Sequence, residues 1–210
     1  MEDVLNMYHL PYDEKRPIIC LDELPFQFLA NKVEPIKMKP GKIKKTDYEY
    51  QRKGTASVFL AFEPKTGKRL VRVYMRRTKT DYCHFQQAVL NYWDKAETIV
   101  QVQDNLNTHN ASSFYENLLP AKAFELMKRF EFHYTPKKGS WLNMAELELS
   151  AISRQCLRGR RIADIETLSH EIETLVKERN KLEIKTKWQF TNEQAREKLK
   201  RHYEKVLSKN

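Results

Sequence analysis

Ile18-Ile19-Cys20-Leu21-Asp22 opens the predicted fold of this chain. The four apolar residues directly follow Pro17 and are typical of a buried strand, and apolar character continues to about Leu29. Asp22 places a carboxylate inside that strand, where an ionised group is costly unless it is paired or binds a metal. Asp22 is therefore the first candidate for a functional residue, although a solvent-facing strand position is the plainer interpretation of Asp22 alone.

The remaining strands and helices follow from similar patterns. Apolar runs and turn residues predict strands over 56–62, 70–74, 98–102 and 130–134. Helical spacing and capping residues predict helices over 80–94 (capped by Thr80 or Asp81), 111–129 (split by Pro120), 141–157 (capped by Ser140), 164–181 (capped by Asp164) and 192–207. This order predicts an α/β fold, a mixed five-stranded sheet flanked by helices with extra C-terminal helices. It resembles the element order of the ribonuclease H-like fold.

The length of 210 residues predicts one domain. Its core is expected over residues 17–160, with residues 1–16 as an N-terminal extension and residues 161–210 as a C-terminal helical extension of the same domain. Residues 32–53 contain Pro35, Pro40 and Gly41 and show little periodicity. We therefore expect them to form a long loop between the first two strands.

The charge of the chain is strongly and unevenly positive. Lys and Arg number 38 against 28 Asp and Glu, which gives +10. Residues 32–53 hold eight basic against three acidic residues, and residues 151–210 hold 15 against nine. Such a surplus favours a polyanionic partner such as nucleic acid, although a solvated surface is the simpler explanation. No apolar run approaches the roughly 18 residues of a membrane span, so we expect no membrane partner.

Two further acidic residues could join Asp22. Asp104 follows the predicted strand 98–102, and ligands of open α/β sheets bind beyond the carboxyl ends of the strands. Glu146 lies in the first two turns of the helix predicted over 141–157. Three such carboxylates would suit Mg²⁺, which prefers oxygen ligands. The alternatives are a turn or capping role for Asp104 and a solvated helix face for Glu146, and the helical wheel does not separate Glu146 from Glu148.

Three motifs carry a resemblance to a known family. They are Cys20-Leu21-Asp22-Glu23, then Gln103-Asp104-Asn105-Leu106-Asn107-Thr108-His109, and then Tyr134-Thr135-Pro136-Lys137-Lys138-Gly139-Ser140-Trp141-Leu142-Asn143-Met144-Ala145-Glu146. With these motifs the sequence resembles the DDE transposases of the mariner-like superfamily, most closely the bacterial insertion sequence 630 family. The resemblance covers nearly the whole chain and implies a ribonuclease H-like catalytic domain.

The resemblance also implies particular site residues. It selects Asp22, Asp104 and Glu146 as the catalytic triad that binds Mg²⁺ or Mn²⁺, with two ions expected. Glu146 is preferred to Glu148 on this ground only. Asn105 and His109 belong to the second motif and are expected to orient Asp104 or to contact DNA, with a turn and a helix-capping role as alternatives.

The implied partners are DNA and a second copy of the chain. Such an enzyme cleaves DNA at the ends of its element and transfers the strands into target DNA, acting as a homodimer on the nucleoid of a prokaryotic cytoplasm. In mariner relatives the segment between the first two strands reaches toward the partner subunit and the DNA, and a mobile surface loop is the alternative here. Phosphate contacts are expected from Lys42, Lys44, Lys45, Arg76 and Arg77.

The chain departs from the family pattern at two points. The 41 residues between Asp104 and Glu146 form a longer interval than is usual in mariner relatives. The first strand begins about 16 residues from Met1, so we expect the family's helix-turn-helix region to be missing or to be supplied by an upstream polypeptide. Two other interpretations therefore stay open: a truncated, inactive DNA-binding remnant, and a ribonuclease H-like nuclease without strand transfer.

Overall fold

The computed structural model describes residues 1–137 and 139–207. Its centre is a five-stranded sheet with the strand order β3-β2-β1-β4-β5. The pairs β1–β2 and β2–β3 are antiparallel, whereas β1–β4 and β4–β5 are parallel. The predicted mixed five-stranded sheet is thereby confirmed. The strands are β1 (Ile18–Asn31), β2 (Tyr50–Glu63), β3 (Lys68–Tyr74), β4 (Ile99–Gln103) and β5 (Phe130–Tyr134).

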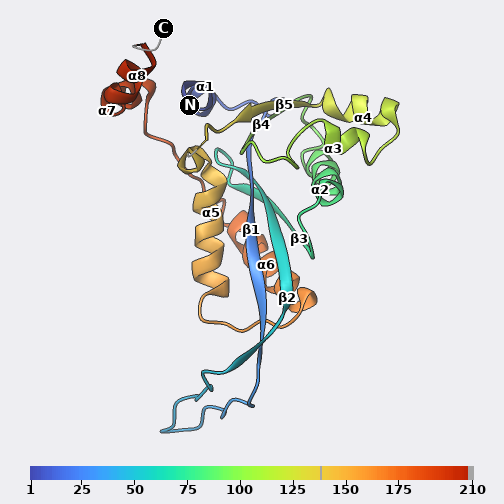
Figure 1. The fold of residues 1–210 in the computed structure, drawn as a ribbon, viewed down its shortest axis with the longest axis vertical. Helices are drawn as coiled ribbons and strands as arrows, with labels where there is room; N and C mark the ends of the chain where they lie inside the picture. The colour runs from blue at the N-terminus through green and yellow to red at the C-terminus, as the bar shows by residue number, and fades with distance from the viewer. Residues whose placement is uncertain (138, 208–210) are drawn as a thin grey trace.

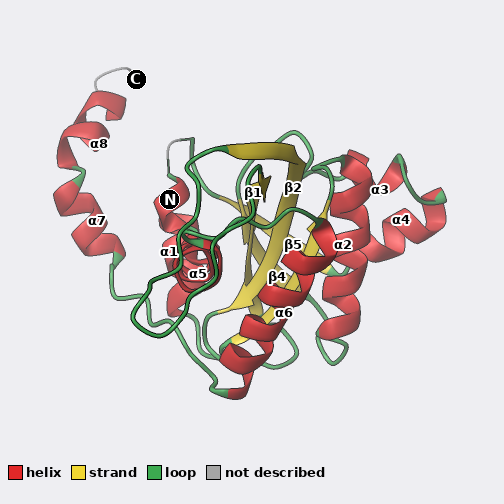
Figure 2. Ribbon diagram, turned by 90° about the horizontal axis from the view of Figure 1, so that it is seen from below, coloured by secondary structure: helices red, strands yellow, loops and turns green. Residues whose placement is uncertain are grey.

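Helices cover both faces of this sheet (Figures 1 and 2). A 3₁₀ turn precedes α5 and a π-helical turn follows it, at Ser140–Leu142 and Ser153–Leu157. No helix in the described part of the chain is long and apolar enough to cross a membrane. The helices are α1 (Glu2–His9), α2 (Lys79–Tyr92), α3 (Ser112–Tyr115), α4 (Pro120–Met127), α5 (Met144–Ile152), α6 (Ile165–Lys181), α7 (Asn192–Lys198) and α8 (Lys200–Leu207).

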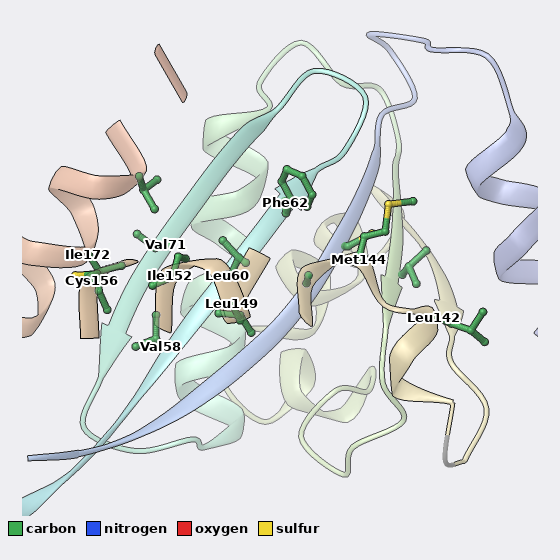
Figure 3. Close-up of a cluster of buried hydrophobic side chains, with 14 of the residues drawn as sticks. Val58, Leu60, Phe62, Val71, Leu142, Met144, Leu149, Ile152, Cys156 and Ile172 are labelled. Carbon is green, nitrogen blue, oxygen red and sulfur yellow. The ribbon is translucent and has the colours of Figure 1, made fainter. Parts of the chain in front are cut away.

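Two separate apolar clusters hold these layers together. Helices α5 and α6 pack on one face, where Leu60 and Phe62 of β2 contact a cluster that includes Leu149 and Ile172 (Figure 3). Helices α2, α3 and α4 pack on the other face over Phe59 and its neighbours. Because both faces are covered, the central strands are apolar in continuous runs rather than in alternation. This burial explains why simple apolar runs predicted the strands.

Asp164 caps α6 as predicted, its carboxylate accepting from the Thr167 backbone N–H at 2.7 Å, but two other helices start differently. Thr78 caps α2, its hydroxyl accepting from the Asp81 backbone N–H, and Asp81 completes a reciprocal capping box as the third helical residue. Neither Thr80 nor Asp81 is therefore the cap. Asn143 caps α5, because the predicted cap Ser140 instead begins the 3₁₀ turn. The predicted last helix, 192–207, is interrupted at Leu199 and forms α7 and α8.

The N-terminal residues contribute to the core. The sequence predicts a fold that starts at Pro17, but Val4, Leu5 and Tyr8 of α1 are buried in the cluster beneath α5. The Tyr8 hydroxyl donates to the Leu142 carbonyl at 2.7 Å. Helix α1 thus packs against the turn that leads into α5.

The predicted basic loop forms a long arm between β1 and β2. The two strands stay paired as far as Asn31 and Tyr50, so residues 50–53 belong to β2 and the arm comprises residues 32–49. Figure 1 shows this arm extending away from the sheet along the long axis of the molecule. At its base, Arg161 donates to the Asn31 side chain at 3.0 Å and to the carbonyls of Asp47 and Glu49 at 2.6 and 2.9 Å.

Candidate active site

Asp22 lies in β1 and points toward α5. Its carboxylate accepts from the Glu23 backbone N–H at 2.8 Å and from the Asn143 side chain at 3.4 Å. Burial raises the pKa of Asp22 to about 7, and the negative charges of Glu23, Asp104 and Glu146 add to the rise. The structure thus brings the predicted acids close enough for their charges to act on one another.

Glu146 and Asp22 face a common pocket. Glu146 lies in the first turn of α5, and a pocket of about 350 Å³ is lined by both acids together with Ser150, Ser153 and Arg154 among others. Asn143 fixes the start of α5 against β1. Its side chain donates to the Leu21 carbonyl at 2.8 Å and accepts from the Ala145 backbone N–H at 3.1 Å. Asn143 therefore sets the position of Glu146 relative to Asp22.

Glu148 occupies a different environment. It is 3% exposed, and its carboxylate accepts from Arg69 at 2.9 Å and from Arg179 at 2.6 and 2.9 Å. Burial alone would raise the pKa of Glu148, but the two arginines lower it. Both oxygens are committed to these arginines, so Glu148 anchors α5 to β3 and α6 and faces away from the pocket.

Asp104 follows β4 directly, with its side chain 39% exposed. Its Oδ1 lies 2.6 Å from Nδ1 of His109. Burial raises the pKa of Asp104, but His109, the backbone of Leu106 and the charge of Arg77 together lower it below the usual value. Asp104 is therefore an ionised carboxylate with one oxygen held against an imidazole.

His109 is fully buried, which excludes direct contact with DNA in this conformation. Burial lowers the pKa of His109, but Asp104 and Glu23 raise it by more than burial lowers it, so the pKa is about 9. Nε2 of the ring lies 2.6 Å from Oε1 of Glu23. Asn105, by contrast, is exposed.

The predicted phosphate contacts fall into two groups. Arg76 and Arg77 are exposed on the segment between β3 and α2, and Arg77 is near enough to Asp104 to lower its pKa. Lys42, Lys44 and Lys45 are exposed on the arm, which leaves the sheet at the opposite end of β1. The structure therefore brings Arg77 to the acids but does not bring the three lysines there.

Glu23 is the site residue that the sequence analysis did not single out. It is 8% exposed and follows Asp22 directly in β1. Successive strand residues point to opposite faces, so a strand buried on both faces must bury one of two adjacent acids on each side. A buried carboxylate needs a partner. The pair Asp22-Glu23 was therefore a usable signal for a hidden base such as His109.

The carboxylates have the right chemistry for a divalent cation. Asp22, Asp104 and Glu146 offer the oxygen ligands that Mg²⁺ prefers, and Mg²⁺ keeps several waters rather than requiring a closed protein cage. Within residues 1–137 and 139–207, no three His, Cys, Asp or Glu side chains form a complete metal-binding group as they stand. Burial raises the pKa of Asp22 most, and the neighbouring carboxylates raise it further; a bound cation would offset both effects. The donor set fits such an ion.

The overall fold has counterparts of known structure. Two solved structures each give a TM-score of 0.55: the Mos1 mariner paired-end complex with Mn, at 15% identity, and the Mos1 transposase paired-end complex with the left transposon end, at 16% identity. The Mos1 strand transfer complex gives 0.51 at 15%. Each match covers 87% of this chain, which spans 55–58% of the length of the matched chains. The predicted ribonuclease H-like fold, that of a transposase catalytic domain, is thereby confirmed.

Sequence comparison gives the family. Among curated proteins none matches the chain. Residues 17–169, however, match the model of a family described as DDE superfamily endonuclease. This match covers more than half of the chain and includes the whole sheet together with Asp22, Asp104 and Glu146. The chain therefore belongs to the DDE superfamily of endonucleases.

Proposed function

We propose that this chain is the catalytic domain of a DDE transposase, of the mariner-like superfamily and related to the insertion sequence 630 family. Its reaction would be cleavage of DNA at the ends of a mobile element and transfer of the strands into target DNA, in a prokaryotic cytoplasm. One observation carries the proposal: Asp22 and Glu146 line one pocket, and Asp104 lies near enough for its charge to act on Asp22. The resemblance of the fold to Mos1 complexes with transposon ends supports it.

Asp22, Asp104 and Glu146 would hold Mg²⁺ or Mn²⁺, with two ions expected. Such ions, when bound, activate an attacking hydroxyl and stabilise the leaving oxygen of an in-line phosphoryl displacement. The protein's own part is to fix the ligands. Asn143 ties the start of α5 to β1, and His109 holds one oxygen of Asp104.

Cationic side chains near the acids would hold the DNA backbone. Arg154 lines the pocket that Asp22 and Glu146 share, and Arg77 lies near Asp104. Guanidinium groups suit this role because they can donate two parallel hydrogen bonds to a phosphate. A phosphate that enters the pocket would therefore meet positive charge on two sides of the carboxylates.

The arm would contact both DNA and a second copy of the chain. It carries six lysines against three acidic residues, and its lysine side chains are exposed. Ile36, Met38 and Ile43 on the same arm are 64–78% exposed. Large exposed apolar residues beside phosphate-binding lysines fit a surface that touches a protein partner and a nucleic acid together. We therefore propose a homodimer on DNA.

The proposal is tested by nicking of a labelled duplex that carries the element ends. Glu146→Gln should abolish nicking in Mg²⁺ or Mn²⁺ and leave the thermal midpoint unchanged. Glu166→Gln is the matched control, because Glu166 also lies in the first turn of a helix, α6, and is exposed. Ca²⁺, which is larger and looser in geometry, should support binding without cleavage. Nicking that survives in excess chelator, or in Glu146→Gln, would contradict the proposal.

A strand-transfer assay separates a transposase from a simple nuclease. Pre-cleaved element ends are incubated with supercoiled target DNA and Mn²⁺, and joined products are counted. Joining supports the transposase. Cleavage without joining, under conditions where the ends are bound, would point to the ribonuclease H-like nuclease instead.

A further inference from the structure

His109 is a buried imidazole held between two carboxylates. Its Nε2 lies 2.6 Å from Oε1 of Glu23, and its Nδ1 lies 2.6 Å from Oδ1 of Asp104. The side chains of His109 and Glu23 are 0% and 1% exposed, whereas that of Asp104 is 39% exposed. The contact thus runs from the interior outward, from Glu23 through His109 to Asp104.

This contact joins two elements that each carry an acid of the candidate site. Along β1, Cys20 packs under α5 and Leu21 packs under α2. Continuing this alternation places Asp22 on the α5 side and Glu23 on the α2 side. Glu23 therefore reaches His109 through the sheet layer opposite Asp22. The result is a cross-link between β1, which bears Asp22, and the segment after β4, which bears Asp104.

Other contacts prevent the imidazole from turning away. The ring of Tyr82 stacks on it, with centroids 4.8 Å apart and planes 27° from parallel. The backbone carbonyl of His109 accepts from the Gln103 side chain and from the Tyr134 hydroxyl, each at 3.2 Å. Backbone and ring face are therefore fixed by neighbours, and the two ring nitrogens are left to Glu23 and Asp104.

We propose that Glu23 is a positioning residue of the acidic site, which acts through His109 to hold Asp104 in the orientation that binds a divalent cation. The inference rests on the proposed function, because it takes Asp104 as a metal ligand. His109 is in ion-pair contact with Asp104. Loss of a partner that orients a metal ligand typically weakens metal binding about 10–100-fold. In the series of contacts Glu23–His109–Asp104, His109 would be next to the metal ligand. Glu23 would be one contact further from the ion and would form the buried end of the series.

The test is Mn²⁺ binding by titration calorimetry, without DNA and without turnover. Glu23→Ala should weaken Mn²⁺ binding by about 10-fold or more. Glu23→Gln keeps an oxygen acceptor and nearly the same volume, so it should retain more affinity than Glu23→Ala. A second readout needs no metal: hydrogen exchange of the peptide over residues 104–110 should be faster in Glu23→Ala, because the His109 amide bonds to the Leu106 carbonyl in this segment.

Glu63→Gln is the matched control. Glu63 is a carboxylate of the same sheet, 1% exposed, and accepts from Trp93 at 2.8 Å and Thr66 at 2.7 Å, both outside the acidic site. This variant should lose stability without losing Mn²⁺ affinity. Equal weakening of Mn²⁺ binding by Glu63→Gln and Glu23→Gln would reduce the effect to general loosening of the sheet and overturn the inference.

Asp104→Asn separates failure of this inference from failure of the proposed function. If Asp104→Asn leaves Mn²⁺ binding unchanged, the metal assignment and the role of Glu23 both fall. If Asp104→Asn weakens binding while folded Glu23→Ala and Glu23→Gln bind Mn²⁺ as the unmodified chain does, only the role of Glu23 falls. If Asp104→Asn and Glu23→Ala both weaken Mn²⁺ binding and Glu63→Gln does not, the result establishes that Glu23 acts on Asp104 through His109.

Discussion

Glu146 and Glu148 leave α5 on different sides: Glu146 lines the pocket with Asp22, and Glu148 is buried between two arginines. Residues two positions apart in an α-helix point about 200° apart around the helix axis. One short segment can therefore place Glu146 in the site and Glu148 in the core. The arginines come from β3 and α6. Glu148 thus fixes the rotation of α5, and the rotation of α5 decides where Glu146 points.

Glu148→Gln should therefore destabilise the protein strongly. The substitution keeps the volume but leaves Arg69 and Arg179 buried without a counter-charge, and breaking a buried ion pair in this way costs about 3–5 kcal/mol. The free energy of unfolding in urea measures the loss. Glu166→Gln, on the exposed first turn of α6, should change it by less than about 0.5 kcal/mol. A loss below about 1 kcal/mol in Glu148→Gln would show that the cluster does not anchor α5.

Asp22→Asn should stabilise the metal-free protein, and more at pH 8 than at pH 5. The pKa of Asp22 is raised from 3.8 to about 7 on folding, so between these values the native state binds more protons than the unfolded state. Stability is then lost as pH rises through this window, because ionisation is easier in the unfolded chain. Asparagine does not ionise and avoids the loss, which is about 1.4 kcal/mol for each pKa unit.

Thermal or urea unfolding in excess chelator at the two pH values measures this difference. Asp94→Asn, at an exposed position after α2, is the control and should change the stability by less than about 0.5 kcal/mol at either pH. An equal gain for Asp22→Asn at pH 5 and pH 8 would mean that folding does not raise the pKa of Asp22.

Neutralising Lys42, Lys44 and Lys45 together should weaken duplex binding about equally for all sequences. Phosphate contacts position a duplex without reading its bases. Each lost contact should also flatten the slope of log affinity against log salt by about 0.9, so the triple alanine variant should lose about 2–3 units of slope. A competition titration of terminal-repeat DNA against scrambled DNA at several salt concentrations measures both effects.

The control for the arm removes the same net charge elsewhere, at the exposed Lys68, Lys95 and Lys122. This variant should weaken binding less than the arm variant does. An identical loss in both would mean that the net charge of +10, rather than the arm, holds the DNA.

Arg161→Ala should loosen the arm without unfolding the domain. Arg161 donates to the carbonyls of Asp47 and Glu49 at the arm base. Trypsin should then cut within residues 32–49 faster, while the thermal midpoint changes little. Arg161→Lys should not restore resistance, because one ammonium cannot reproduce the planar fork of a guanidinium. Arg160→Ala is the control, since Arg160 pairs with Glu171 instead. Equal cutting in Arg161→Ala and the unmodified chain would contradict the role of Arg161.

The strands were predictable because their cause is local. Residues 58–62 of β2 are all buried. Because both faces of this strand are covered, all of these residues are apolar, and the sequence shows a continuous apolar run. The start of α5 was not predictable in this way. Ser140 and Asn143 are both good capping residues, and the choice falls to Asn143 through its bond to the Leu21 carbonyl, 122 residues away in the chain.

The positions of the acidic side chains also depend on contacts between residues that are far apart in the sequence. The helical wheel could not separate Glu146 from Glu148, because the partner that removes Glu148 from the pocket, Arg69, is 79 residues distant. His109, which pairs with Glu23, is 86 residues distant. Contacts of such separation leave no periodicity in a single sequence. The motif resemblance, and not the pattern, selected Glu146.

The continuous pairing of β1 and β2 sets the distance between the acidic site and the arm. Asn31, the last residue of β1 before the arm, lies nine positions after Asp22. At about 3.3 Å per residue, the arm base lies about 30 Å from Asp22. One turn of B-DNA advances about 34 Å. If the chain acts on DNA as proposed, the DNA backbone that contacts the arm and the bond that is cleaved at Asp22 would therefore lie about one helical turn apart on a single duplex, or would belong to two different duplexes.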